Sequence, residues 1–406
     1  MNEKYITRPL YTEKVRPFIG KQLIKILTGQ RRVGKSYIML QLMDTVKMQY
    51  PKANIIYIDK ELLSYSEVKD SNSLYDYVSA RLTSRPDFLF IDEVQEIDGF
   101  QLCLRSLLNE NKCDIYCTGS NAKMLSGELA THLGGRYIEI PVHSLSYREF
   151  LEFNSLSVSD ESLNQYLTLG GMPYLHNLSL DRNVIYEYLR NVYSTILLKD
   201  VVSREAIRNV AFLENLVAYL ADNVGSLFSA QNINKYLKSQ HINMPTQTIL
   251  NYLRALCNSY FICKVQRADV NGMKVFEIGE KYYFEDLGLR NAIRMFDYRK
   301  DINKLMENVV YIELLRHGYN VYIGKNDTKE VDFIAEKDNE NLYIQVAYML
   351  YDEQTVQREF GGLMEIANHY PKYVITMDTL QNGGSYQGIK QVHLRDFLLA
   401  EDKGKL

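Results

Sequence analysis

The sequence predicts an α/β fold that begins with a parallel sheet covered by helices on both faces. Short apolar runs recur through the first 141 residues, and stretches with a helical pattern separate them. Runs without polar alternation are typical of strands buried on both faces, and helical connections of about 10–15 residues let such strands run parallel. The runs expected as strands are Leu23–Leu27, Asn54–Ile58, Asp87–Ile91, Cys113–Cys117 and Arg136–Ile140.

After Pro141 the pattern becomes helical. The helices expected there are Tyr147–Phe153, Ser159–Leu169, Asn183–Leu198, Ala211–Ala221, Ala230–Gln240 and Thr246–Asn258. Two strands follow, Phe261–Gln266 and Lys274–Ile278, and the Asn271-Gly272 step between them is a hairpin signal. Three helices followed by a hairpin indicate a winged helix, a relative of the helix-turn-helix.

The end of the chain has the pattern of a small α/β module. Its expected elements are a helix over Ile302–His317, strands over Asn320–Gly324, Val331–Ala335, Leu342–Tyr348 and Lys372–Thr376, and a helix over Thr355–Asn368. We therefore expect four parts, which are a parallel-sheet domain over 1–141, a helical lid over 142–210, a winged helix over 211–284 and an α/β domain over 285–406.

Composition narrows the class of protein. The 406 residues include 47 Lys and Arg against 50 Asp and Glu, so the net charge is −3 and any nucleic-acid surface must be a local patch. Hydrophobic residues make up 46%, which excludes a disordered chain. No run approaches the roughly 18 apolar residues of a membrane span, the N-terminus lacks a signal-peptide pattern, and the five scattered cysteines suit reduced thiols. We expect a cytoplasmic protein without a membrane partner.

The strongest motif fits G-x-x-x-x-G-K-[ST] and lies between an expected strand and an expected helix. Its residues are Gly29, Gln30, Arg31, Arg32, Val33, Gly34, Lys35 and Ser36, and with Tyr37 they are the residues expected to bind a nucleotide. Glycines let backbone N–H groups cradle phosphate oxygens at a helix N-terminus. Lys35 would reach the β- and γ-phosphates, and the Ser36 hydroxyl would bind Mg²⁺. The competing interpretation is a glycine turn near a surface lysine.

A second motif places two acids at the end of a buried strand. Asp92 and Glu93 follow Phe88-Leu89-Phe90-Ile91. In an open α/β sheet the ligand crevice lies at this end of the strands. Asp92 would hold the Mg²⁺ shell, and Glu93 would orient and polarise the attacking water. Such acids can also simply cap the next helix near its positive end.

Two further residues are candidates for catalysis. Asn121 follows the fourth expected strand, where its amide would touch the γ-phosphate or the water, although an Asn at a strand end is also ordinary turn chemistry. Arg136 follows Gly134-Gly135 and is a candidate arginine finger acting on a neighbouring subunit. Its competing role is a structural salt bridge.

Together these motifs, with Leu145-Ser146-Tyr147-Arg148-Glu149-Phe150, resemble the AAA-superfamily P-loop ATPases of prokaryotes that carry a C-terminal domain of unknown function. The extra strand between the two motifs and the acid directly after Asp92 are similar to the catalytic-glutamate division of P-loop ATPases. The resemblance covers essentially the whole chain and implies ATP as the nucleotide. It also implies that Pro173, in Gly171-Met172-Pro173, packs on adenine; a helix stop is the alternative.

The expected third helix of the winged helix carries Thr246, Gln247, Asn251 and Arg254, which are side chains that read bases or phosphates. Only Arg254 of these is a cation, and the cations nearby are scattered. Because phosphate contacts dominate affinity for DNA, we expect weak DNA binding at best, and a protein–protein or lid role for the winged helix is an equal alternative.

The last module resembles a restriction-endonuclease-like core. That fold places a Glu on its first helix, an Asp on a strand and Glu-x-Lys on the next strand, and its acids hold Mg²⁺. Glu307 and Asp332 match the first two places, but Gln345 and Ala347 stand at the third. We therefore expect a nuclease relic without its metal site or its cationic stabiliser.

The predicted function is Mg²⁺-dependent ATP binding and hydrolysis that couples nucleotide state to domain rearrangement. The alternative is a slow ATP-gated switch or a binding module for DNA or protein with little turnover. An active nuclease is the least expected function. ATP and ADP, Mg²⁺, a protein partner and a second copy of the chain are the expected ligands and partners.

Overall fold

The computed structural model describes residues 5–406 except 85, 123–132, 206, 229, 240–243, 271–272, 274, 296, 327–328 and 379–382. The chain divides into two compact units. The first unit is Met1–His143 with Asn258–Tyr260, and the second unit is Ser144–Cys257 with Phe261–Leu406. The expected boundary after residue 141 lies two residues before this division.

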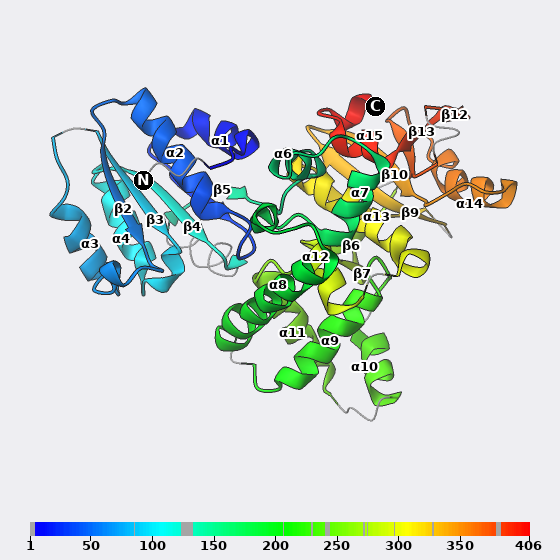
Figure 1. Ribbon diagram of the computed structural model, residues 1–406, viewed down its shortest axis with the longest axis horizontal. Helices are drawn as coiled ribbons and strands as arrows, with labels where there is room; N and C mark the ends of the chain where they lie inside the picture. Colours follow the sequence, from blue (N-terminus) through cyan, green and yellow to red (C-terminus); the bar gives the residue numbers. More distant parts are fainter. Residues whose placement is uncertain are drawn as a thin grey trace. The chain divides into compact units, whose positions relative to one another are not determined.

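The first unit contains a five-stranded parallel sheet, which confirms the predicted α/β class (Figure 1). Its strands are β1 (Ile24–Thr28), β2 (Asn54–Asp59), β3 (Asp87–Asp92), β4 (Asp114–Gly119) and β5 (Tyr137–Pro141), in the order β2-β3-β4-β1-β5. Each begins within one residue of its expected start. β4 lies between β1 and β3, so it separates the strand that leads into the glycine-rich motif from the strand that ends at the acid pair.

Alternating side chains of the sheet build two apolar layers. Phe88 and Phe90 of β3 pack in one layer with α1 (Pro9–Val15) and α2 (Lys35–Gln49). Leu89 and Ile91 pack in the other layer with α3 (Ser71–Ser79) and α4 (Phe100–Asn109). Because both faces are buried, every residue of β3 is buried, which explains why its sequence is a continuous apolar run.

The second unit begins with helices near the expected positions. They are α6 (Tyr147–Phe153), α7 (Asp160–Leu169), α8 (Arg182–Thr195), α9 (Val210–Asp222), α10 (Ala230–Ser239) and α11 (Thr246–Asn258). The α-helix expected over Asn183–Leu198 differs, because from Ile196 to Ser203 the chain continues as a π-helix. No helix in the described part of the chain combines the length and the apolar character needed to cross a membrane.

Both strands of the expected hairpin belong to an eight-stranded sheet. The strands are β6 (Ile262–Asp269), β7 (Val275–Phe284), β8 (Asn320–Asn326), β9 (Lys329–Lys337), β10 (Glu340–Val346), β11 (Lys372–Thr376), β12 (Ser385–Tyr386) and β13 (Ile389–His393), in the order β12-β13-β11-β10-β9-β8-β6-β7. The helices α12 (Leu287–Ile293), α13 (Tyr298–Arg316), α14 (Glu353–Met364) and α15 (Leu394–Leu399) complete this part.

The expected boundary between 284 and 285 does not separate two sheets. β6 pairs with β7 on one side and, in parallel, with β8 on the other. These ladder hydrogen bonds use the backbone groups of β6 that a free hairpin would leave exposed. The hairpin is therefore continuous with the C-terminal sheet. The sequence could not reveal this, because β6 and β8 are far apart along the chain.

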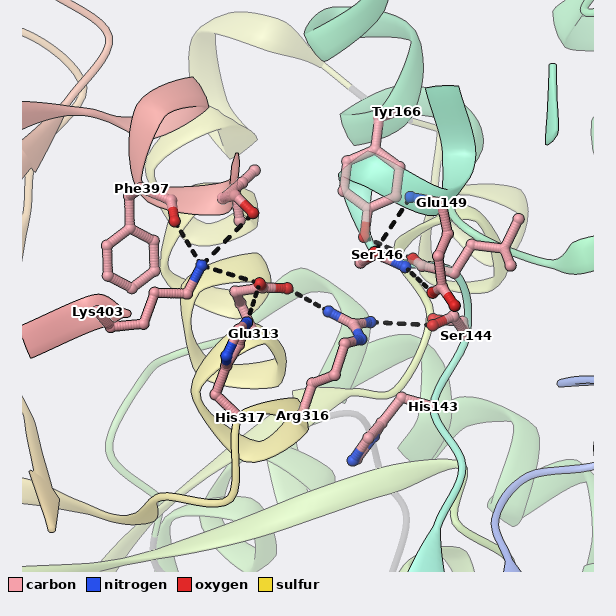
Figure 2. Close-up of polar contacts among 12 residues, drawn as sticks. His143, Ser144, Ser146, Glu149, Tyr166, Glu313, Arg316, His317, Phe397 and Lys403 are labelled. Atoms are coloured by element: carbon pink, nitrogen blue, oxygen red, sulfur yellow. Dashed lines mark hydrogen bonds and ion pairs between the residues drawn. The ribbon is translucent and has the colours of Figure 1, made fainter. Parts of the chain in front are cut away.

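A buried ion cluster on α13 connects the two ends of the second unit (Figure 2). The Glu313 carboxylate lies between the Lys403 ammonium, at 3.0 Å, and the Arg316 guanidinium. Arg316 also donates to the carbonyl oxygen of Ser144, the first residue of the unit, at 2.9 Å. Burial opposes ionisation of Glu313, but the two cations lower its pKa, so the cluster stays charged.

Candidate nucleotide-binding site

The glycine-rich motif forms the turn between β1 and α2. Gly34 is the N-cap of α2 with φ of 93°, and Gly29 has φ of 139°. A Cβ atom on Gly29 would lie 2.2 Å from the carbonyl oxygen of Val142, so both backbone conformation and space require glycine there. The motif therefore ends at a helix N-terminus, as predicted, where N–H groups have no partner within the helix.

Lys35, the first residue of α2, bends back over the loop. Its side chain is 4% exposed, and its Nζ atom donates to the carbonyl oxygens of Gly29 at 3.0 Å and Gln30 at 2.9 Å. The same atom lies 3.9 Å from Oε1 of Glu93. The two motifs predicted from the sequence thus meet through one buried ammonium.

Ser36 and Asp92 lie together, as expected for a metal pair. The Ser36 hydroxyl hydrogen-bonds the Asp92 carboxylate, which also accepts from Thr118. Burial raises the pKa of Asp92, and these two hydrogen bonds oppose the shift. A hydroxyl and a carboxylate are the hard oxygen ligands that Mg²⁺ prefers, so these residues fit the ion. Among the described residues, no three His, Cys, Asp or Glu side chains could hold a metal alone, so phosphate and water would complete the shell.

Glu93 follows β3 in a left-handed backbone conformation, with φ of 55°. A non-glycine residue in this region stores strain and is typical of functional sites. Burial raises the pKa of the carboxyl, but the Lys35 and Arg31 charges prevail and the net pKa is lowered. Glu93 is therefore an ionised, buried carboxylate beside the phosphate-binding loop.

Three polar side chains that the sequence analysis did not single out hold the acid pair. Thr118 accepts the Glu93 N–H at 2.8 Å and donates to Asp92. Ser120 donates to Oε2 of Glu93 at 3.0 Å, and Gln95 donates to the same oxygen. The sequence does not mark these residues, because only the pairing of β4 with β3 shows that the hydroxyls at the end of β4 lie beside the acids.

Gln30, Arg31 and Tyr37 have different environments. Gln30 is fully buried, and neither atom of its side-chain amide has a hydrogen-bond partner among the described residues. Arg31 pairs with Glu61 at 3.0 Å. Tyr37, on the first turn of α2, is 53% exposed. A buried amide without hydrogen bonds lowers the stability of the folded protein. The Gln30 amide could therefore form hydrogen bonds with a bound ligand.

The other two motif residues, Arg32 and Val33, point in different directions. Arg32 is exposed and has φ of 72°, whereas Val33 is fully buried. The carbonyl oxygen of Val33 accepts from Arg8 at 2.8 Å. Val33 therefore connects the loop to Arg8, in the N-terminal segment of the same unit.

Asn121 and Arg136 lie at opposite edges of the sheet. Asn121 follows the carboxyl end of β4, which is the edge of the phosphate-binding loop, but it is the neighbouring Ser120 that contacts Glu93. Arg136 precedes β5 at the other edge, and its Nη1 donates to Oδ1 of Asn109 at 2.6 Å. Arg136 therefore does not reach the loop of its own chain, and action on a neighbouring copy stays a prediction.

Pro173 belongs to the second unit. It begins a 3₁₀ helix, Pro173–Asn177, after Gly170 has capped α7 with φ of 80°. This is the helix stop named as the alternative. Contact of Pro173 with adenine stays a prediction.

Two family models match the chain. Residues 21–151 match a model described as an AAA domain, and residues 160–300 match one described as a domain of unknown function (DUF8612). Among solved structures, a Walker-type ATPase of Pyrococcus abyssi is 16% identical with a TM-score of 0.48, over 72% of this chain and 97% of that chain.

Two relatives extend over both units. An uncharacterized protein of Methanocaldococcus jannaschii is 30% identical over 354 residues, which are 83% of this chain and 77% of that protein. An uncharacterized protein of Haemophilus influenzae is 34% identical over 406 residues, which are 98% of this chain and 100% of that protein. Because this second relative aligns along its full length and the AAA-domain match covers most of the first unit, the chain belongs to the same family, that of AAA-superfamily P-loop ATPases with a C-terminal domain of unknown function.

Proposed function

We propose that the protein binds ATP with Mg²⁺ and hydrolyses it. The observation that carries the proposal is the Ser36–Asp92 hydroxyl–carboxylate pair, with an ionised Glu93 as the next residue, beside the phosphate-binding loop. Residues that could bind a metal ion, bind phosphate and act as a base thus lie together at the carboxyl ends of the strands.

Each residue then has a distinct task. The loop N–H groups hold phosphate oxygens, and Lys35 exchanges its carbonyl partners for the β- and γ-phosphates. Mg²⁺ beside Ser36 and Asp92 would supply charge that neutralises the leaving phosphate oxygens. Glu93, ionised and held by hydrogen bonds, orients water and accepts its proton during attack on the γ-phosphorus.

One observation favours slow turnover, and so the alternative of a nucleotide-gated switch. Oε2 of Glu93 accepts hydrogen bonds from both Ser120 and Gln95, while Oε1 faces Lys35. Both carboxylate oxygens are therefore engaged before a nucleotide arrives. Glu93 has to release one of these contacts to polarise water, and that rearrangement adds to the barrier.

We propose further that nucleotide state changes the arrangement of the two units. Arg8 supports this coupling because it is 2% exposed and donates both to Val33 of the loop, at 2.8 Å, and to the carbonyl oxygen of His143, at 3.0 Å. His143 is the last residue of this segment of the first unit. Identical limited-proteolysis patterns without nucleotide, with ADP and with a non-hydrolysable ATP analogue would contradict the coupling.

Besides the nucleotide, duplex DNA is a candidate ligand of the protein. Gln247, Asn251 and Arg254 are exposed on one face of α11 and connected by hydrogen bonds of 3.2 and 2.9 Å. Arg254 is the cation of this group, and Lys264 on the hairpin is already ion-paired. We therefore expect weak, salt-sensitive binding of duplex DNA, measured by fluorescence anisotropy and reduced by R254A.

The test of nucleotide binding is a titration with a fluorescent ATP analogue, with and without Mg²⁺. Ser36→Ala removes the metal-binding hydroxyl and should abolish the gain in affinity that Mg²⁺ gives, without removing the phosphate cradle. Equal affinity in wild type with and without Mg²⁺ would contradict the assigned metal pair. No binding at all would overturn the proposed function.

A further inference from the structure

A buried lysine lies among three carboxylates in the C-terminal sheet. Lys281 of β7 is 3% exposed, and its Nζ atom lies 2.9 Å from Oε1 of Glu307, on α13. The same atom lies 2.9 Å from Oε1 of Glu330 and 3.7 Å from Oδ1 of Asp332, both on β9. One ammonium therefore faces three acids from two different elements. Tyr283 also donates to Glu307.

Glu307 and Asp332 are the acids that the endonuclease-like pattern assigns to a metal site. The lysine expected to be missing from that pattern is absent, since Ala347 stands in its place. The chain does supply a cation, Lys281, from a strand that precedes the expected module. It stands where the carboxylate oxygens converge, which is the position that a metal ion would need.

Position 345 is built for a neutral side chain. Gln345 accepts from the backbone N–H of Asp332 at 3.3 Å and donates to Oε2 of Glu359 at 3.0 Å. A glutamate there could not donate and would face the Glu359 carboxylate at hydrogen-bonding distance. Gln345 thus connects two acids instead of adding a third metal-binding carboxylate.

Position 347 is built for an apolar side chain. Ala347 is 5% exposed and packs in an apolar cluster that includes Val331 and Phe360. A lysine there would bury its ammonium among hydrocarbon groups. The two departures from the endonuclease pattern therefore follow from the packing of this sheet.

The carboxyl groups of the cluster have cationic partners from the chain itself. Lys281 neutralises one carboxylate, and Arg267 lies 3.8 Å from Glu330. Two cations therefore already lie among the three carboxyl groups, where a divalent ion would have to bind.

We infer that Lys281 takes the place of a divalent cation in the second unit, so that Glu307, Glu330 and Asp332 form a metal-independent charge cluster. The residues present do not fit the metal that the endonuclease pattern implies. The inference is independent of the nucleotide site, which lies in the first unit.

The test is a titration of the full chain with Mn²⁺ in the absence of nucleotide. Calorimetry and the electron paramagnetic resonance signal of the ion both measure the binding. Wild type and E307Q should bind the same amount of Mn²⁺, because Glu307 is not expected to hold the ion in the wild-type protein. K281M should gain one Mn²⁺ site, at least about tenfold tighter than any site in wild type, and its unfolding temperature should rise with Mn²⁺. K264M is the matched control, because Lys264 on the neighbouring strand forms an ion pair with Glu280, outside the three-acid cluster, and is 42% exposed.

Two results would overturn the inference. One is a Mn²⁺ site in wild type that E307Q abolishes, or nicking of plasmid in Mn²⁺ that D332A abolishes; neither measurement needs the K281M variant to fold. The other is a folded K281M protein that gains no Mn²⁺ site, because the ammonium would then not occupy a cation position.

Discussion

The Nζ atom of Lys35 lies 3.9 Å from Oε1 of Glu93, and both side chains are buried. The ammonium thus lowers the pKa of the Glu93 carboxyl, while the loop carbonyls of Gly29 and Gln30 accept its hydrogen bonds. A bound triphosphate would compete for the same ammonium. Nucleotide binding and the state of Glu93 are therefore connected through one residue.

Lys35→Met should weaken ATP binding by at least about tenfold, because the phosphates lose a buried cation that lies at the phosphate-binding loop. The substitution also removes the first of the charges that lower the pKa of Glu93. The measurement is a nucleotide titration at fixed Mg²⁺. Lys47→Met, exposed on the last turn of the same helix, should bind ATP like wild type. Equal affinities of the two variants would contradict the role of Lys35.

Gln95→Ala should raise kcat severalfold with little change in ATP affinity, because it frees one oxygen of Glu93 from a contact made before nucleotide arrives. Steady-state ATP hydrolysis measures this. If Gln95 instead orients Glu93 for attack on water, kcat will fall, and slow turnover will need another explanation.

Thr118→Val should lower the free energy of unfolding by about 1–3 kcal/mol, since it leaves the buried N–H of Glu93 without its acceptor at 2.8 Å. Denaturant unfolding gives this value. Thr45→Val is the control of the same shape, because that hydroxyl is bonded only within its own helix and is half-buried. A loss no larger than that of the control would mean that Thr118 does not hold the acid pair.

The stability of the protein should depend on pH through Asp332. Its pKa is raised in the folded state by burial, so the unfolded chain loses the proton near 3.8 while the folded protein still holds it. The free energy of unfolding therefore falls as the pH rises above about 4, until the raised pKa is passed. Thermal unfolding from pH 4 to 8 should show this slope in wild type and in Asp338→Asn, which is exposed. Asp332→Asn should flatten it, and an unchanged slope in that variant would contradict the assignment.

The sequence was sufficient for the first unit because its strands are buried on both faces. The apolar run before Asp92 predicted a buried strand, and the glycine pattern at Gly29 and Gly34 predicted a turn that leads into a helix; the structure has both. The contact between Ser36 and Asp92 was also predictable, since both residues lie at the carboxyl edge of one parallel sheet.

Side-chain partners across strands were not predictable. Thr118 and Ser120 look like ordinary strand-end residues until the register of β4 against β3 is known. Lys281 was missed for a similar reason: its strand seemed to belong to a separate winged helix, and only the pairing of β6 with β8 places it beside Glu307.

The most direct measurement is Mg²⁺-dependent ATP hydrolysis by wild type and Glu93→Gln, with nucleotide binding measured on the same samples. Glu96→Gln, an exposed acid three residues away, is the matched control. We expect wild type and Glu96→Gln to hydrolyse ATP, and Glu93→Gln to bind it with similar affinity while losing at least about a hundredfold in turnover. Equal turnover in Glu93→Gln and wild type would contradict the assignment of Glu93 as the base, and tight binding without turnover in wild type would indicate a nucleotide-gated switch instead of a hydrolase.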